Sequence, residues 1–158
     1  MRRALWMVVL VGALVLSGCM PGGPLSYTEQ DDAGNDSHEG AEVTNMEIGA
    51  SLFGSATWVI NGRFRDGDDW DHYLVYPVGQ PTVTFASEHN GEPQKDGIPI
   101  KVEEYDNTDT LINEGHLNKS EGFTFEGQPD GNYWVVEVFA VSQSGYDSGE
   151  YTVTMTVQ

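Results

Sequence analysis

The last segment of the chain, residues 150–157, alternates strictly between apolar and polar side chains. A two-residue period is that of a β-strand with one buried face, because successive side chains of a strand point to opposite sides. Each large apolar side chain contributes about 1.5–3 kcal/mol when it is fully buried. A slip of one residue would exchange the apolar set for threonines, so the register is strongly specified. The apolar set is Tyr151, Val153, Met155 and Val157, and the opposite set is Thr152, Thr154 and Thr156.

The same period recurs along the chain, and no window shows convincing helical periodicity. In residues 132–141 the inward set is Trp134, Val136, Val138 and Ala140. Turn residues stand before the last two strands, at 129–131 and 144–149. The sequence therefore predicts an all-β domain, an antiparallel β-sandwich or jelly roll of about seven to nine strands. The expected strands are residues 57–64, 72–76, 81–86, 98–105, 110–113, 122–125, 132–141 and 150–157.

The N-terminal residues have the order of a secretory signal peptide. Arg2 and Arg3 supply positive charge, residues 4–16 are apolar, and small residues follow at 17 and 18. This apolar run is shorter than the roughly 20 residues that a membrane-spanning helix needs. Because it ends in Leu-Ser-Gly-Cys, it resembles the lipobox of bacterial lipoproteins, which are cut before the cysteine and acylated on its thiol. The resemblance implies a covalent lipid on Cys19, and Met20 after it implies transport to the outer membrane.

These features divide the chain into three parts. Residues 1–18 are the predicted signal peptide, and residues 19–40 are the acylated cysteine and a flexible linker rich in Pro, Gly and Asp. Residues 41–158 are the predicted globular domain, long enough to bury a single core. Cys19 is the only cysteine, so the domain has no internal disulfide.

The chain is strongly acidic, with 25 Asp and Glu against 7 Lys and Arg and a formal net charge of −18. Removal of Arg2 and Arg3 with the signal peptide changes this from −18 to −20. Such a charge repels phosphate backbones, so the sequence excludes nucleic acid as a partner. It also disfavours adsorption to anionic lipid, which leaves the lipid anchor as the expected membrane contact. Acidity of this kind serves solubility or binds divalent cations.

Four motifs follow one another in a fixed order: Gly62, Asp-Trp-Asp-His-Tyr-Leu-Val at 69–75, Gly-Asn-Tyr-Trp-Val-Val-Glu-Val at 131–138, and Gly-Glu-Tyr-Thr-Val-Thr at 149–154. With these motifs the chain resembles, over about residues 35–157, the bacterial pre-peptidase C-terminal (PPC) domain. PPC domains are β-sandwich modules found beside secreted peptidases and are similar to the collagen-binding modules of clostridial collagenases. The resemblance implies a non-catalytic module that binds a protein or a polysaccharide outside the cytoplasm.

The resemblance also implies a calcium site, since some PPC domains bind Ca²⁺ between two acidic segments. The matching positions here are Asn35, Asp36, Asp68 and Asp71, while Ala33 stands where the family has a glutamate. Hard oxygen ligands suit Ca²⁺, and extracellular modules bind it at about 10⁻⁴–10⁻³ M. The alternative is a solvated acidic turn without a metal.

Motifs of common enzyme classes are missing from the sequence, including Gly-x-Ser-x-Gly, His-Glu-x-x-His and the Walker phosphate loop. The four histidines are scattered without metal spacing, and we expect them at the surface or in turns. Glu103 and Glu104 are adjacent, so on a strand they point to opposite faces and cannot form a catalytic pair. We therefore expect a protein that is not an enzyme, with a small hydrolase as the alternative.

Three tryptophans lie beyond the signal peptide, and Trp134 belongs to an inward set. Trp58 and Trp70, with Tyr146, would supply the stacking surface of a carbohydrate-binding jelly roll, while a core position is the other assignment for each tryptophan. The sequence thus leaves two kinds of ligand open for a lipid-anchored envelope module: a protein partner and a polysaccharide.

Overall fold

The computed structural model describes residues 25–30, 37–50, 55–64, 70–89, 92–93, 98–117, 122–139 and 149–157. These residues form β-strands and one short 3₁₀-helix, η1, so the prediction of an all-β sandwich is confirmed. Within these ranges no helix has the length and apolar character to cross a membrane. The elements are β1 (Ser26–Thr28), η1 (His38–Gly40), β2 (Glu42–Gly49), β3 (Thr57–Phe64), β4 (Trp70–Val78), β5 (Thr82–His89), β6 (Glu92–Pro93), β7 (Ile100–Tyr105), β8 (Leu111–Leu117), β9 (Phe123–Glu126), β10 (Tyr133–Phe139) and β11 (Gly149–Val157).

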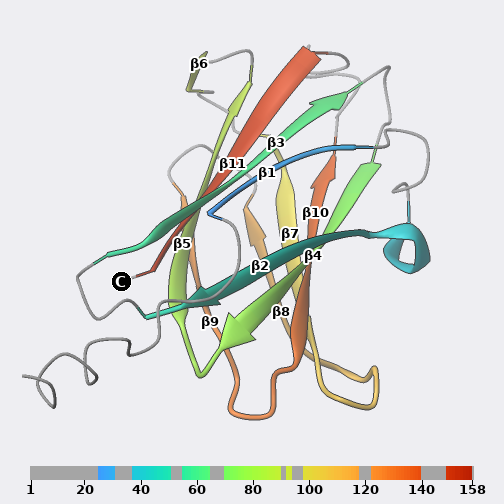
Figure 1. Ribbon diagram of the computed structural model, residues 1–158, viewed down its shortest axis with the longest axis vertical. Helices are drawn as coiled ribbons and strands as arrows, with labels where there is room; N and C mark the ends of the chain where they lie inside the picture. The colour runs from blue at the N-terminus through green and yellow to red at the C-terminus, as the bar shows by residue number, and fades with distance from the viewer. Residues whose placement is uncertain are drawn as a thin grey trace, which may run out of the picture.

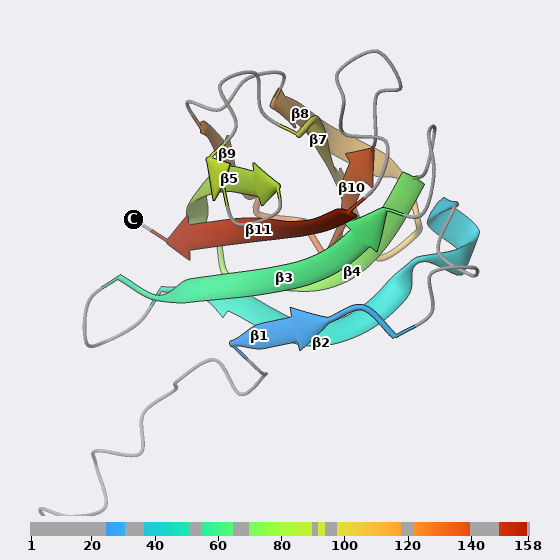
Figure 2. The same ribbon diagram turned by 90° about the horizontal axis from the view of Figure 1, so that it is seen from above.

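The strands form two sheets that face each other across the core (Figures 1 and 2). The six-stranded sheet has the order β1-β3-β11-β5-β6, with β9 also paired to β5. The five-stranded sheet has the order β2-β4-β10-β7-β8. The strands β2 to β5 alternate between the two sheets, as do β9 to β11. Strands close in sequence are therefore mostly on opposite sides of the core.

Two of the strand pairs are parallel, which corrects the prediction of a purely antiparallel sandwich. β1 runs parallel to β3, and β2 runs parallel to β4, while the other described pairs are antiparallel. The reason is that the chain crosses between the sheets. After β2 it passes to the other sheet as β3, and it then returns as β4, which runs beside β2 in the same direction. A hydrophobic period shows which residues face inward, but it does not show which strands are neighbours.

Side chains of both sheets fill the space between them. The predicted inward sets of β11 and β10 are confirmed, since each described member is at most 3% exposed. Ala140, the last member of the β10 set, lies outside the described residues. On the opposite side of β10, Val135 is 0% and Glu137 6% exposed. β10 is the central strand of its sheet, so side chains of the strands on either side of it also cover Val135 and Glu137 on the outer face.

The ordered domain begins before residue 41, because β1 and η1 lie within the segment predicted to be a linker. β1 has only three residues, too few for a visible period, and its Tyr27 ring packs 6.2 Å from the ring of Tyr73. β2 escapes prediction because its apolar residues do not follow a two-residue period: Val43 points outward and is 49% exposed, while the inward set is Thr44, Met46 and Ile48. The pairing of β2 with β4 shifts register between Val43 and Glu47. There Asn45 has a left-handed φ of 56°, and the Thr44 hydroxyl donates to the carbonyl oxygen of Leu74 (2.6 Å).

Candidate functional site

Residues of three of the sequence motifs meet at one end of the core. Gly62 comes from β3, Asp71 and Tyr73 from β4, and Tyr151 from β11. The Tyr151 hydroxyl donates to Asp71 Oδ2 (2.6 Å) and lies 2.5 Å from the Tyr73 hydroxyl. Asp71 and Tyr73 are 0% exposed and Tyr151 2%. Burial, together with the nearby charge of Asp71, raises the pKa of Tyr73 and of Tyr151, so both hydroxyls stay protonated.

Gly62 lies directly against the two tyrosine side chains of this cluster. A Cβ atom at this position would lie 2.6 Å from Tyr73 Oη and closer still to Tyr151 Cζ and Oη. Only glycine therefore leaves room for Tyr151 to reach Asp71 and the Tyr73 hydroxyl across the sandwich. The motif residues form a closed hydrogen-bonded link between the two sheets, and this link gives the motif order a structural cause.

A second link closes the edge of the sandwich where β1 and β2 lie side by side (Figure 2). The Tyr27 hydroxyl donates to Glu42 Oε2 (2.8 Å), and the backbone N–H of Gln30 donates to Glu42 Oε1 (3.1 Å). Burial and this bond to the Glu42 carboxylate raise the pKa of Tyr27. The start of the described chain is thus fixed to both sheets.

Three of the four predicted calcium ligands, Asn35, Asp36 and Asp68, lie outside the described residues. Asp71 is described, and its carboxylate faces the core and binds the hydroxyl of Tyr151. Over the described ranges no group of three or more His, Cys, Asp or Glu side chains is arranged to hold a metal ion. Calcium binding therefore stays a prediction.

A second buried carboxylate occupies the other end of the core. Glu104 is 0% exposed and accepts hydrogen bonds from the backbone N–H of Gln128 (3.0 Å) and from Asn113 Nδ2 (3.3 Å). Gly131 makes room for it, since a Cβ there would lie 2.8 Å from Glu104 Cδ. Glu103 lies on the outer face of β7, so the prediction that these two acids point to opposite faces is confirmed.

The predicted stacking surface is not assembled as expected. Trp58 is 0% exposed and belongs to the core, because it occupies an inward position of β3, so its assignment to a binding surface is wrong. Trp70 is 44% exposed, and its ring stacks on Phe139 with centroids 5.1 Å apart. Tyr146 lies outside the described residues. Trp70 is therefore the one predicted platform residue that the structure places at the surface.

A chain of ionisable side chains, here called the charged chain, crosses the outer face of the five-stranded sheet from β4 to β7. His72 Nε2 lies 4.0 Å from Glu137 Oε1, Lys101 Nζ lies 3.5 Å from the same oxygen, and Lys101 also bonds to Glu103. Partial burial lowers the pKa of Lys101, but the bonds to both carboxylates outweigh this effect and raise it. His72 and His89 are 5% and 6% exposed, which corrects their expected placement at the surface or in turns.

Beside this charged chain, the outer face of the five-stranded sheet forms an open groove of about 720 Å³, within the size range of ligand sites. Tyr133 stacks on Tyr105 at 5.2 Å and donates its hydroxyl to Asp109 Oδ1 (3.1 Å). Aromatic and aliphatic side chains thus stand between exposed carboxylates. The groove is lined by Glu39, Leu74, Tyr76, Asp109, Asn132 and Tyr133.

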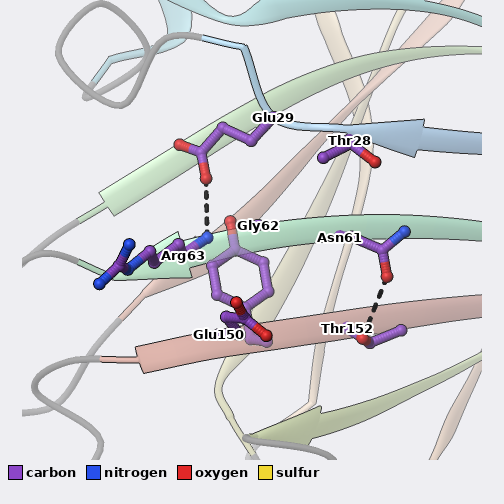
Figure 3. A pocket seen from close by; sticks show the side chains of 8 residues that line it. Thr28, Glu29, Asn61, Gly62, Arg63, Glu150 and Thr152 are labelled. Carbon is purple, nitrogen blue, oxygen red and sulfur yellow. Dashed lines mark hydrogen bonds between the residues drawn. The ribbon is translucent and has the colours of Figure 1, made fainter.

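A second open groove, of about 480 Å³, lies on the outer face of the six-stranded sheet over β1, β3 and β11 (Figure 3). The Arg63 backbone N–H donates to Glu29 Oε2 (2.7 Å), and the Thr152 hydroxyl donates to Asn61 Oδ1 (3.3 Å). The side chain of Arg63 extends away from Asn61 and Thr152 (Figure 3). This second groove is polar, in contrast to the groove lined by tyrosines.

No protein-family model matches the chain, and no curated protein matches it in sequence. The solved structures that the chain matches include two periplasmic lysozyme inhibitors of g-type lysozyme named PliG. The Aeromonas hydrophila protein is 12% identical, with a TM-score of 0.43 over 75% of this chain and 99% of its own. The Salmonella Typhimurium protein is 12% identical, with a TM-score of 0.40 over 72% of this chain and 99% of its own. Likeness at this level carries no argument about function.

Proposed function

We propose that this chain is a non-catalytic module of the bacterial cell envelope that binds a basic protein through the outer face of the five-stranded sheet. The observation that carries the proposal is the groove on this face, where Tyr76 and Tyr133 stand between the carboxylates of Glu39 and Asp109. Protein interfaces are enriched in aromatic residues, which act as rigid anchors, and have polar rims. The stacked rings of Trp70, which is 44% exposed, and the half-buried Phe139 extend this surface along β4 and β10.

The charge of the molecule supports a basic partner. Arg63 and Lys101 are the only Lys or Arg residues in the part of the chain that the structure describes. Lys101 is engaged by Glu103 and Glu137, so it offers little positive charge to a ligand. The net charge of −18 attracts cationic proteins at long range and raises their association rate.

The buried acids support a non-catalytic role. Asp71 is bonded to Tyr151, and Glu104 to Gln128 and Asn113, so both carboxylates act as structural hydrogen-bond acceptors inside the core. Burial that is matched by hydrogen bonds is the usual condition of structural polar groups. Glu39 and Asp109, which face solvent at the groove, can instead attract a positively charged partner.

The PPC resemblance and the lipid anchor belong to this proposal. The meeting of Gly62, Asp71, Tyr73 and Tyr151 in one cluster supports a PPC-like module, because it gives three of the motifs a shared structural role. Acylation of Cys19 would hold the module at the outer membrane. Membrane fractionation of Cys19→Ser tests the anchor, and an unchanged membrane fraction would contradict it.

The partner is tested by capture from an envelope extract on immobilised protein, with two variants run in parallel. Tyr133→Ala removes an aromatic anchor and is expected to weaken binding by about 2 kcal/mol, or roughly 30-fold in Kd. Thr124→Ala, an exposed residue of the other sheet, serves as the matched control. The proposal requires a captured protein of basic composition that Thr124→Ala retains and Tyr133→Ala loses. If no captured protein depends on Tyr133, the proposed face is wrong.

A polysaccharide is the second candidate ligand, favoured by the 44% exposure of the Trp70 ring. Sugar rings stack on exposed aromatic faces, so insoluble glycans would retain the protein and release Trp70→Ala. A collagen-like protein, run in the same pull-down, tests the binding that the PPC resemblance implies. Retention on glycans that does not depend on Trp70 would exclude this surface as the sugar site.

A further inference from the structure

The outer face of the six-stranded sheet carries a patch without charged side chains. It spans β3, β11 and β5, whose paired residues form two neighbouring rows. We call this patch the neutral face. In a chain with 25 acidic residues, another copy can approach such a patch without direct charge repulsion. The rows are Val59–Thr154–Ala86 and Thr57–Thr156–Thr84.

The composition of the neutral face suits the packing of one sheet on another. Threonine and valine are β-branched, so their χ1 angles are already restricted and little side-chain entropy is lost when they are covered. Face-to-face sheets pack about 10 Å apart with small side chains between them. The neutral face has no aromatic ring, so it lacks the stacking groups that a polysaccharide site uses.

We propose that the neutral face packs on the neutral face of a second copy of this chain, related by a two-fold axis parallel to β11. Because β11 lies between β3 and β5, this axis places β3 of one copy over β5 of the other.

Charges at the border of the patch select this arrangement. Arg63 on β3 pairs with Glu150, and Glu88 on β5 pairs with Thr152, so Arg63 and Glu88 lie one row apart at the same end. Both side chains are exposed. The two-fold axis brings Arg63 of each copy to Glu88 of the other, and each Arg63 also stands next to the Glu150 carboxylates near the axis. A two-fold axis perpendicular to the strands would place Arg63 over the threonine end instead.

The size of the patch predicts a weak dimer. The whole contact face is larger than the two neutral rows, because it includes the flanking strands β1 and β9 and the border row of Asn61, Thr152 and Glu88. Five strands at about 4.8 Å spacing are about 24 Å wide, and three rows at about 6.8 Å per two residues are about 20 Å long. Two such faces bury roughly 1,000 Å², the lower end of the range for specific interfaces. At 0.15 M salt the Debye length is about 8 Å, which screens repulsion between the distant acidic faces.

Sedimentation equilibrium of the chain from residue 19 with Cys19→Ser tests the dimer, since this protein contains every described residue. The average mass is expected to rise from that of one chain towards two as concentration increases from about 5 µM to about 500 µM. Thr154→Glu places a charge at the centre of the neutral face and should hold the mass at one chain. His116→Glu adds the same charge at an exposed position of the other sheet and should dimerise normally.

A charge exchange tests the two-fold arrangement without changing the centre of the face. Arg63→Glu should weaken dimerisation at least tenfold, and the double variant R63E/E88R should restore it, because the contact is rebuilt with reversed signs. A single-chain mass at every concentration overturns the proposal. So does a dimer that tolerates Thr154→Glu, or a double variant that stays as weak as Arg63→Glu.

Discussion

Gly62→Ala adds one methyl group to a glycine that is tightly enclosed by core side chains. The new Cβ would lie 2.6 Å from Tyr73 Oη and closer to the ring of Tyr151, whereas non-bonded heavy atoms rest at about 3.5–4.0 Å. One of the tyrosines must therefore move. Any shift of Tyr151 lengthens its 2.6 Å bond to Asp71, whose carboxylate is fully buried.

The expected cost follows from these two effects. Overpacking of a well-filled core costs about 1–3 kcal/mol. Loss of a hydrogen bond to a buried charged group adds about 1.5–3 kcal/mol. We expect Gly62→Ala to lower the free energy of unfolding by about 3–6 kcal/mol, a large share of the 5–15 kcal/mol that holds a typical domain together.

Urea unfolding measures this loss as a lower midpoint at unchanged m-value. Gly79→Ala is the matched control: Gly79 has a φ of 73°, and a Cβ there meets no atom within 4 Å. It should cost only the backbone strain of a left-handed alanine, about 1 kcal/mol. If Gly62→Ala is no worse than Gly79→Ala, the link between Gly62 and the tyrosine cluster is refuted.

Three further predictions concern the buried tyrosines, the Lys101 network and the expected calcium site. The raised pKa of Tyr73 and Tyr151 means that the folded state holds these protons more tightly than the unfolded chain does, so stability is complete below the ordinary pKa of 10.0 and falls as pH rises above it. Tyrosinate absorbance from these residues should appear only together with the loss of strand circular dichroism, and earlier titration would contradict their burial. Lys101→Met should destabilise the fold by about 1–3 kcal/mol in urea unfolding, because two carboxylates lose the cation between them, and a change within error would show that solvent screens this network. Added Ca²⁺ should raise the melting temperature of the metal-free protein, and Asp36→Asn should remove the rise; a rise that survives the substitution places the ion elsewhere.

Some parts of the candidate site could be predicted and others could not. Trp70 was assignable to the surface only as one of two options, because an isolated tryptophan carries no sign of which face of its strand is covered. The charged chain through His72, Lys101 and Glu137 has no signal in sequence, since its members come from three strands that are distant along the chain. The groove beside Tyr133 depends on the same strand order and on the loop that carries Asp109.

The sequence by itself determined the class of fold and the composition of the core. A two-residue period is a local property of the strand, so Tyr151, Val153 and Met155 could be assigned to the interior before their neighbours were known. It also determined the charge that limits the choice of partners. Tertiary structure alone decided that β2 pairs with β4, that Trp58 is buried, and that Gly62 lies under two tyrosines. These facts depend on how strands cross between the sheets, and pairing across such distances is set by the packing of the whole sandwich.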